Sequence, residues 1–353
     1  MVKGMKKRIY VAMSGGVDSS LAAALLQKQG YDVHGVYMKE WNPPGIECSS
    51  GDDRAMAARV AAHLHIPFAV WDFRAEYKKS VADYMLGAYK SGRTPNPDVM
   101  CNREIKFGIF LKQALKHGAD FIATGHYINV KKTRGAYHLY QAHDTNKDQT
   151  YFLWTLTQKE LRYCLFPIGD YEKPKVRELA KKFALPSWNK KDSQGVCFVG
   201  KLDFGQFLRT YLPHKKGKVV TTSGEVVGEH DGVWFYTLGQ RRGISIGGGT
   251  PYYVAAKNMK KNILIVGVGN EDKKLFEKEL MAKHVRWIAG KAPKLPITIK
   301  ARIRYRQPLE TCRISKTAKG VNVVFSKPQR AVTPGQSIVF YKGKEMLGGG
   351  VIV

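Results

Sequence analysis

The chain has 353 residues, 44% of them hydrophobic and 25% charged, which fits two or three folded domains and excludes a disordered chain. It carries 58 Lys and Arg against 29 Asp and Glu, a formal net charge of +29. This excess predicts a polyanionic partner, above all nucleic acid, and a basic surface without such a partner is the alternative.

The cysteines and the apolar runs limit the cellular setting. The five cysteines form no C-x-x-C pair, which argues against a zinc site of the usual spacing. An odd, sparse set of cysteines in a chain of this size argues against a secreted disulfide framework. The N-terminal apolar run is too short for a signal peptide, and no stretch approaches the about 18 apolar residues of a membrane span. We therefore expect a reducing, cytoplasmic location and no membrane partner.

Strands and helices are predicted to alternate in the N-terminal part. Strands are expected where short apolar runs occur, and helices where longer segments are rich in helix formers. Because strands joined by helices form parallel sheets, a doubly wound α/β nucleotide-binding domain is predicted for residues 1–204. The predicted strands are 8–13, 31–41, 67–73 and 119–127, and the predicted helices are 19–30, 52–66, 76–92 and 103–118.

The remainder of the chain has a different pattern. Short β-rich runs with many glycines predict a small β-rich central domain at 205–280. Residues 281–353 alternate apolar and polar side chains between turn signals, which predicts a compact antiparallel β-barrel. Arg302, Arg304 and Arg306 alternate in this part, so on a strand they would share one face. That face would either follow a nucleic-acid backbone or be solvated surface.

The turn after the first predicted strand reads Ser-Gly-Gly-Val-Asp-Ser-Ser, residues 14–20. Two glycines let the backbone turn tightly, and the N-terminus of the next helix offers unpaired N–H groups and partial positive charge. This combination suits phosphate, but the lysine of a Walker loop is absent. Simple γ-phosphate hydrolysis is therefore not favoured, and a plain capped turn is the alternative.

Two cysteines lie in polar loops. Cys101 follows a proline-rich stretch, and Asn102 is expected to cap the next helix, which would place the thiol at a positive helix end and favour the thiolate. Cys197 lies in a Ser-Gln-Gly loop with Lys190 and Lys191 upstream. From the residues alone, buried packing and nucleophilic catalysis are equally good interpretations of this pair.

The glycine loop resembles the signature of the ATP-pyrophosphatase, or PP-loop, family, which cleaves ATP between its α- and β-phosphates to adenylate a substrate. Longer motifs narrow this resemblance to the tRNA-specific 2-thiouridylases, from Arg8 to Val353. These motifs are TPNPDVMCN, TGHY, KDQTYFLW, PIGDYEKPKVRELA, SQGVCFVG, YTLGQRRG and PGQSIVFY. The resemblance implies an ATP-dependent transferase that adenylates O2 of the wobble uridine of tRNA, releases pyrophosphate, and then transfers sulfur from a cysteine persulfide, giving 2-thiouridine and AMP.

The resemblance also implies the residues of the site. Asp98 is expected to act as general acid/base, Cys101 as nucleophile and Cys197 as persulfide carrier, with a Cys101–Cys197 disulfide after transfer. The expected ATP-binding residues are Ala12, Met13, Ser14, Gly15, Gly16, Val17, Asp18, Ser19, Met38 and Gly125. The expected tRNA-binding residues are Asn96, Pro97, Asp98, His126, Lys147, Asp148, Gln149, Tyr305, Arg306 and Gln336, the first three at the target base.

Cofactors and partners follow from the same resemblance. Mg²⁺ is expected with ATP, and no metal site made by the protein alone is expected. An iron–sulfur cluster held by Asp98, Cys101 and Cys197 is a less favoured alternative, and a non-catalytic RNA-binding module disagrees with the intact glycine loop. The expected partners are the tRNAs for Lys, Glu and Gln and a persulfide donor such as a cysteine desulfurase or a sulfur-relay protein. Cys48, Cys164 and Cys312 are expected to be packing or surface thiols.

Overall fold

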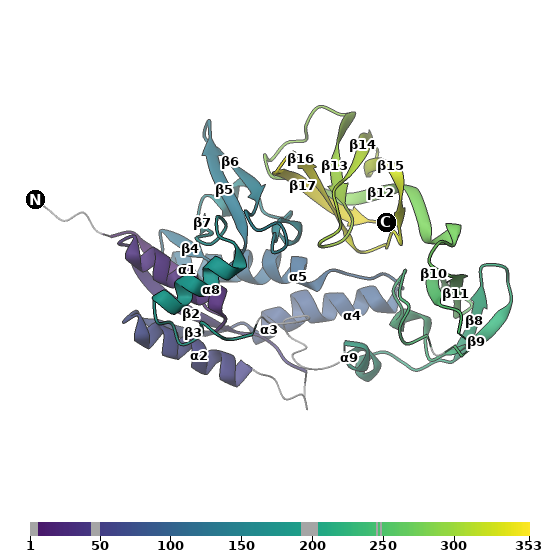
Figure 1. The fold of residues 1–353 in the computed structure, drawn as a ribbon, viewed down its shortest axis with the longest axis horizontal. Helices are drawn as coiled ribbons and strands as arrows, with labels where there is room; N and C mark the ends of the chain where they lie inside the picture. Colours follow the sequence, from purple (N-terminus) through teal and green to yellow (C-terminus); the bar gives the residue numbers. More distant parts are fainter. Residues whose placement is uncertain (1–5, 44–49, 192–203, 245, 248) are drawn as a thin grey trace, which may run out of the picture.

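The computed structural model describes residues 6–43, 50–191, 204–244, 246–247 and 249–353. An α/β domain, a small β-rich region and a β-barrel follow one another along the chain (Figure 1). This architecture confirms the fold class predicted from the sequence. In these described ranges, no helix has both the length and the apolar character needed to cross a bilayer.

The N-terminal domain is built on a parallel sheet with the strand order β3-β2-β1-β4-β7. The chain moves from the central β1 to β2 on one side and later to β4 on the other, so the order reverses at β1. Ligands of open α/β sheets bind at such a reversal, beyond the carboxyl ends of the strands. The strands are β1 Arg8–Ala12, β2 Asp32–Lys39, β3 Phe68–Asp72, β4 Phe121–Ala123 and β7 Cys164–Leu165.

Helices cover both faces of this sheet, as the continuous apolar character of β1 requires. Ile9 and Val11 of β1 belong to the core formed with α1, α2 and α8, whereas Tyr10 and Ala12 belong to the core on the other face. The first layer comprises α1 Val17–Lys28, α2 Ser50–His63 and α8 Lys173–Lys182. The second layer comprises two long helices with π-helical segments: α3 Arg74–Tyr77, η1 Lys78–Ala82 and α4 Asp83–Lys90, then α5 Pro97–Met100, η2 Cys101–Phe110 and α6 Leu111–Lys116.

A β-hairpin of the N-terminal domain, β5 Ile128–Thr133 and β6 Ala136–Gln141, extends toward the barrel (Figure 1). β6 pairs with the last strand of the chain, with Tyr140 opposite Glu345 and Leu139 opposite Met346. The hairpin therefore continues the sheet of the barrel. The short elements η3 Thr150–Phe152 and α7 Gln158–Leu161 follow it in the sequence.

The central region contains α9 Phe204–Tyr211 and a four-stranded sheet in the order β10-β11-β8-β9. Its sheet combines one parallel pair, β8 with β11, and two antiparallel pairs. Met259, next to this sheet, contacts Gly92 at the end of the second-layer helix, so the region lies against the loop that leads to Cys101. The remaining elements are β8 Gly217–Thr221, β9 Val226–His230, η5 Val233–Phe235, β10 Tyr252–Asn258, β11 Ile263–Val268 and η6 Lys273–Leu275.

The C-terminal region is an antiparallel barrel in the order β12-β15-β14-β13-β16-β17, closed by pairing of β12 with β17. Its interior is apolar and includes Phe325, Phe340 and Ile314. β12 spans the predicted boundary between residues 280 and 281. The strands are β12 Phe276–Trp287, β13 Ile297–Arg302, β14 Glu310–Thr317, β15 Gly320–Arg330, β16 Ser337–Lys342 and β17 Glu345–Ile352.

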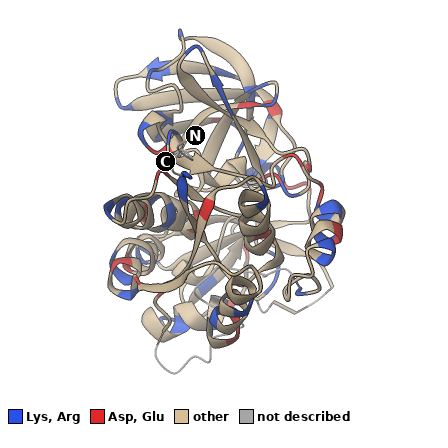
Figure 2. Ribbon diagram, turned by 90° about the vertical axis from the view of Figure 1, so that its left-hand side faces the viewer, with Lys and Arg blue, Asp and Glu red and all other residues tan. Residues whose placement is uncertain are grey.

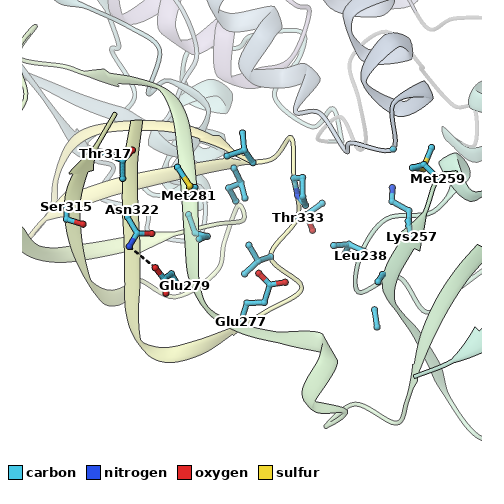
Figure 3. Close-up of a pocket in the computed structure, with 18 residues that line it drawn as sticks. Leu238, Lys257, Met259, Glu277, Glu279, Met281, Ser315, Thr317, Asn322 and Thr333 are labelled. Atoms are coloured by element: carbon cyan, nitrogen blue, oxygen red, sulfur yellow. Dashed lines mark hydrogen bonds between the residues drawn. The ribbon is translucent and has the colours of Figure 1, made fainter. Parts of the chain in front are cut away.

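A cavity of about 960 Å³ lies between the central region and the barrel (Figure 3). Lys257 lines it, and burial lowers the pKa of this ammonium group to about 8. Gly92, Thr333 and Pro334 also line it, so the cavity adjoins the proline-rich loop but includes none of residues 12–19. Basic side chains are not confined to one element: Figure 2 shows Lys and Arg in the barrel and along the helices below it.

Candidate active site

The glycine loop lies where the strand order reverses. β1 ends at Ala12, Gly15 has a φ of +73°, and Gly16 precedes the first residue of α1. Serine side chains close the loop, because Ser20 Oγ donates to Gly16 O at 2.8 Å and Ser14 N donates to Ser19 Oγ at 3.2 Å. The loop therefore presents a tight turn and the N-terminus of α1, as predicted for a phosphate site.

Two other predicted ATP-binding residues flank this loop. Met38 lies in β2, whose Val36 carbonyl accepts from Met13 N at 2.8 Å. Gly125 follows β4 on the other side, and a Cβ atom on it would lie 2.6 Å from Ser19 N. The close approach to the first turn of α1 explains why residue 125 is a glycine. The structure thus brings all predicted ATP-binding residues to one edge of the sheet.

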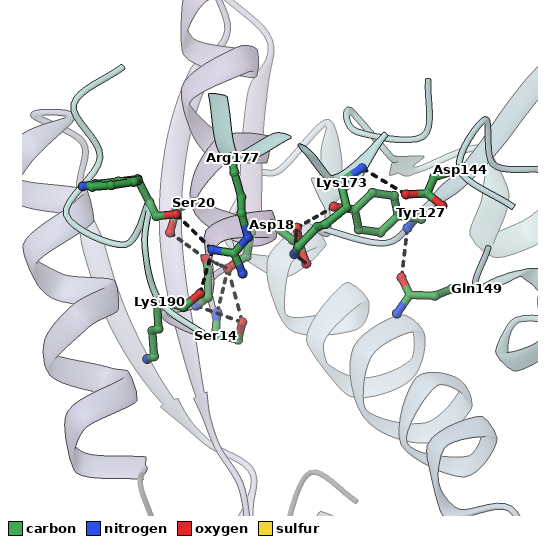
Figure 4. A network of polar contacts seen from close by, with 12 residues as sticks. Ser14, Asp18, Ser20, Tyr127, Asp144, Gln149, Lys173, Arg177 and Lys190 are labelled. Atoms are coloured by element: carbon green, nitrogen blue, oxygen red, sulfur yellow. Dashed lines mark hydrogen bonds and ion pairs between the residues drawn. The ribbon is translucent and has the colours of Figure 1, made fainter. Parts of the chain in front are cut away.

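A polar network joins the glycine loop to later parts of the chain (Figure 4). Asp18 accepts from Tyr127 Oη at 2.7 Å and from Lys173 Nζ at 2.7 Å. Tyr127 N donates to Gln149 Oε1 at 2.9 Å, so a predicted tRNA-binding residue connects to the loop through one intervening residue. The sequence analysis missed Tyr127 and Lys173. The only available signal was their position in the motifs TGHY and PIGDYEKPKVRELA.

The environment of Cys101 differs from the prediction. Asn96, rather than Asn102, caps the helix: its side chain accepts from Val99 N at 3.2 Å, and Pro97 is the first helical residue. Cys101 therefore lies inside the helix, is 3% exposed, and has a pKa raised to about 12, first by burial and second by the charge of Glu40. The predicted helix-end thiolate is wrong for the free protein, where this thiol is neutral.

Three ionisable side chains near Cys101 interact electrostatically with one another or with the thiol: Asp98, Lys106 and His126. Burial raises the pKa of the Asp98 carboxyl, and the charge of Lys106 opposes that shift. Burial and then the same lysine keep the pKa of His126 well below its usual value, so the imidazole is neutral. Lys106 also interacts with Cys101. Asp98, Cys101, Lys106 and His126 thus form one polar cluster, in which Cys101 and His126 are buried and Asp98 and Lys106 are half-buried. Lys106 was not predicted. A carboxyl with a raised pKa in a partly buried site is suited to proton transfer.

The residues predicted to bind tRNA fall into groups. Gln336 joins the barrel to the proline-rich loop around Thr94 and Pro95, since its Nε2 donates to Thr94 O at 3.1 Å and to Pro95 O at 2.9 Å. Tyr305 packs against Phe152, with the two ring centroids 4.5 Å apart. The exposed guanidinium of Arg306 lies 5.2 Å above the Tyr305 ring.

Asp148 and the arginine row require corrections. Asp148 is 1% exposed and pairs with Arg302 at 2.7 Å, so neither side chain presents a charge to a ligand at the surface. Arg304 Nη2 donates to the carbonyls of Leu238 and Ala331. Because β13 ends at Arg302 and Arg306 has a φ of +63°, the three arginines do not share a strand face. The basic row was therefore a wrong prediction, and only Arg306 of the three is exposed.

The two other predicted features concern cysteines and metals. Cys197 and Cys48 lie outside the described residues, whereas Cys164 and Cys312 are free, buried thiols. Within the described part of the chain, no three or more His, Cys, Asp and Glu side chains gather in a way that would hold a metal ion.

A glycine loop at the switch point of a parallel sheet, in a domain that also holds the buried Cys101 thiol and the half-buried Asp98 carboxyl, defines a nucleotide-binding α/β enzyme of the PP-loop class. Family models agree: residues 7–201 match a tRNA methyl transferase HUP domain, 205–268 a tRNA methyl transferase PRC-barrel domain and 277–352 an aminomethyltransferase β-barrel domain. Full-length relatives carry a more specific name. The tRNA-specific 2-thiouridylase MnmA of Halalkalibacterium halodurans is 49% identical and that of Pseudomonas paraeruginosa 47% identical, each over 98% of this chain and 94% of the relative.

The chain belongs to the tRNA-specific 2-thiouridylase family, and it is a transferase that thiolates uridine in tRNA. Among solved structures, a 4-thiouridine synthetase–RNA complex with bound ATP is 18% identical with a TM-score of 0.38, covering 55% of this chain and 46% of that chain. The U34-tRNA thiolase NcsA from Methanococcus maripaludis with its 4Fe–4S cluster is 18% identical with a TM-score of 0.37, covering 54% and 60%. Both scores are too low to support a conclusion about this chain.

Proposed function

We propose that this enzyme thiolates C2 of the wobble uridine of tRNA in two stages, adenylation by ATP and then sulfur transfer from a persulfide. The observation that carries this proposal is the proximity of the thiol to the nucleotide edge of the sheet. The charge of Glu40 contributes to the raised pKa of the Cys101 thiol, and Glu40 follows β2, two residues after Met38. A base bound beside Cys101 would therefore adjoin ATP bound at the glycine loop.

The first stage activates a poor leaving group. The O2 oxygen of uridine attacks the α-phosphorus of ATP, the bond from that phosphorus to the bridging oxygen breaks, and pyrophosphate leaves with the electron pair. Residues 12–19, Met38 and Gly125 are the proposed ATP site. Mg²⁺ normally binds a nucleotide through its phosphates and one or two carboxylates, and Asp18 is the carboxylate of this loop. When bound, the ion would offset the charge of the phosphates.

The second stage replaces AMP by sulfur. The outer sulfur of a Cys197 persulfide attacks C2, the C2–O bond breaks, and AMP departs with the electron pair. The Cys101 thiolate then attacks the inner sulfur, which releases 2-thiouridine and leaves a Cys101–Cys197 disulfide for reduction by an external thiol. Because the Cys101 pKa is raised to about 12 in the free protein, this thiol needs a proton acceptor. Asp98, the adjacent carboxyl, is the proposed one.

Contacts with tRNA are proposed around the same cluster. Asn96 and Pro97 begin the helix that carries Cys101, and they are the proposed contacts to the target base together with Asp98. Lys147, Gln149, Tyr305 and Arg306 are proposed to bind tRNA directly. The buried residues His126 and Asp148 and the loop-holding Gln336 would act by positioning their neighbours. The tRNAs for Lys, Glu and Gln and a persulfide-donating protein remain the proposed partners.

The test is incubation of the enzyme with a wobble-uridine tRNA, ATP, Mg²⁺ and a persulfide donor, followed by mass spectrometry of the tRNA nucleosides and measurement of pyrophosphate. Cys101→Ser and Cys197→Ser are expected to lose 2-thiouridine but to retain pyrophosphate release. Cys312→Ser, at a free, buried thiol in the core of the barrel, is the matched control and is expected to remain active. Full thiolation by either of the first two variants would contradict the proposal, and activity that depends on stoichiometric iron and sulfide would favour a cluster instead.

A further inference from the structure

Arg330 ends β15 at the junction of the barrel with β10 of the central region (Figure 1). Its Nε and Nη2 atoms are buried, and no described residue accepts a hydrogen bond from them. These two atoms form one edge of the planar guanidinium group, the edge that can donate two parallel hydrogen bonds to a carboxylate or a phosphate. The group lies 4.7 Å from the centroid of the Tyr253 ring, which holds it in place. The ring attracts the positive charge, but it does not replace the missing hydrogen-bond acceptors.

A second guanidinium group borders the same place. A Cβ atom on Gly239 would lie 3.4 Å from Arg330 Nη1 and 3.5 Å from Arg304 Nη2. Arg304 Nη2 donates to uncharged groups, the carbonyls of Leu238 and Ala331, at 2.9 and 3.0 Å. Burial lowers the pKa of Arg304, and the charge of Arg330 contributes to that shift. Neither arginine forms an ion pair with a residue that the structure describes, so two like charges lie close together without a counter-charge.

The chain supplies little negative charge around this pair. The three segments that carry the residues of this site contain thirteen Lys and Arg and no Asp or Glu. They are residues 232–258, 301–309 and 311–344. On the neighbouring strand β12, Glu277 pairs in register with Gln329. Because adjacent residues of a strand point to opposite faces, Glu277 lies on the face away from Arg330. The composition therefore favours a counter-charge that comes from a ligand.

We propose that Arg330, with Arg304 beside it, binds a phosphate group of the tRNA backbone. A phosphate offers several anionic oxygen atoms, which match the unpaired edge of the guanidinium group. Arg241 and Arg242, exposed in the loop that follows Gly239, add positive charge to this side of the junction. Such a contact fixes the position of the tRNA without reading its sequence. The inference depends on tRNA as the substrate, but not on the proposed adenylation or sulfur transfer.

A purely structural role of Arg330 predicts a different result. If the residue only joins the barrel to Tyr253, Arg330→Met removes a favourable cation–π contact and lowers the hydrogen-exchange protection of amides in β15. If Arg330 serves phosphate binding, the same variant replaces a buried, unpaired charge by an uncharged side chain of similar length. The protection of β15 in the free enzyme is then expected to stay the same or to increase.

The experiment measures the affinity of the full-length enzyme for a wobble-uridine tRNA at several salt concentrations. Arg330→Met is expected to bind about tenfold more weakly near 0.1 M salt, and the slope of log affinity against log salt is expected to fall in magnitude by about one. Arg74→Met is the matched control, because Arg74 is exposed and already pairs with Asp72 at 2.6 Å. Its affinity and slope are expected to equal those of the unmodified enzyme.

Free phosphate and pyrophosphate have the same chemistry as a backbone phosphate, so both are titrated separately without tRNA. A reduced salt slope with unchanged binding of these anions supports the tRNA assignment. Weaker binding of either anion by Arg330→Met with an unchanged slope overturns that assignment in favour of a free anion. An unchanged slope with unchanged anion binding overturns the site altogether, and lower protection of β15 in Arg330→Met contradicts the argument from the unpaired charge.

Arg330→Lys provides a second variant, which keeps the charge even if Arg330→Met does not fold by circular dichroism. Lysine lacks the edge with two parallel donors, so this variant is expected to keep the salt slope but to bind tRNA about threefold more weakly. An affinity equal to that of the unmodified enzyme would contradict the two-donor contact.

Discussion

Replacement of Arg302 by methionine tests whether this residue stabilises the fold or binds tRNA. Arg302 Nη2 donates to Asp148 Oδ2 at 2.7 Å, and the two side chains are 5% and 0% exposed. The guanidinium also lies 4.8 Å from the centroid of the Tyr341 ring. The Arg302→Met variant therefore leaves a buried carboxylate without its counter-charge while it fills much of the same volume.

The expected loss of unfolding free energy depends on the hydrogen bonds that Asp148 keeps in the variant. Removal of one member of a buried ion pair costs about 3–5 kcal/mol. Asp148 keeps hydrogen bonds from Thr150 Oγ1 at 2.9 Å and from Gln141 Nε2 at 3.0 Å, which partly compensate the charge. We therefore expect a loss near the lower limit, about 3 kcal/mol in the free energy of unfolding of the barrel. Arg302→Met combined with Asp148→Asn carries no uncompensated charge, and it is expected to lose about 1 kcal/mol.

The assay is native-state hydrogen exchange of amides in β13 and β16, because a chain with several domains has no single global unfolding free energy. Arg313→Met, at an exposed position of β14, is the control and is expected to change the protection by less than about 0.5 kcal/mol. Binding of tRNA is measured in parallel as a function of salt. A cost below about 1 kcal/mol for Arg302→Met, together with a salt slope reduced by about one phosphate contact, would refute the structural role.

Three further outcomes are expected. Asp18→Ala abolishes pyrophosphate release in the presence of tRNA, and unchanged release would contradict the role of the glycine loop. Gly125→Ala is expected to weaken ATP binding, because the added Cβ would lie 2.6 Å from Ser19 N and displace α1. The control Gly87→Ala, where nothing lies within 4 Å of the added Cβ, is expected to bind ATP normally. Equal ATP affinities of the two variants would disprove the steric argument. Iodoacetamide labels Cys101 slowly in the folded free protein up to about pH 10, since its pKa is raised to about 12. In the unfolded state this thiol ionises at a lower pH than in the folded state, so it contributes stability below about pH 9 that is lost as the pH rises toward about 12. Fast labelling at pH 8, measured by peptide mass spectrometry, would contradict the buried, neutral state of the thiol.

Local sequence patterns predicted the fold class and the glycine loop, because strands, helices and turns depend on neighbouring residues. The contacts between distant residues were beyond such patterns. Lys173 and Asp18 are 155 positions apart, and Gln336 and Thr94 are 242 apart. Only the packing of α8 on α1, and of the barrel on the proline-rich loop, brings these side chains together.

The two wrong predictions have local causes. Alternating arginines predict a strand face only while the strand continues, and β13 ends at Arg302, ahead of the positive φ of Arg306. For Cys101, a stronger helix start precedes it. Asn96 caps the helix and Pro97 is its first residue, so Asn102 follows within an established helix. The burial of the thiol depends on the tertiary core, which no local pattern reveals.

The pairing of β6 with β17 has a consequence for the modularity of this enzyme. Strand β17 of the barrel hydrogen-bonds to a hairpin that belongs to the first domain, so segments about 200 residues apart in the sequence form parts of one sheet. A protease that cuts only between the central region and the barrel would leave the two fragments associated through this sheet. By the same reasoning, exchange of the barrel by recombination requires a replacement whose last strand matches the edge of β6 in length and register. The domains are consecutive along the chain, but the first and the last share one sheet.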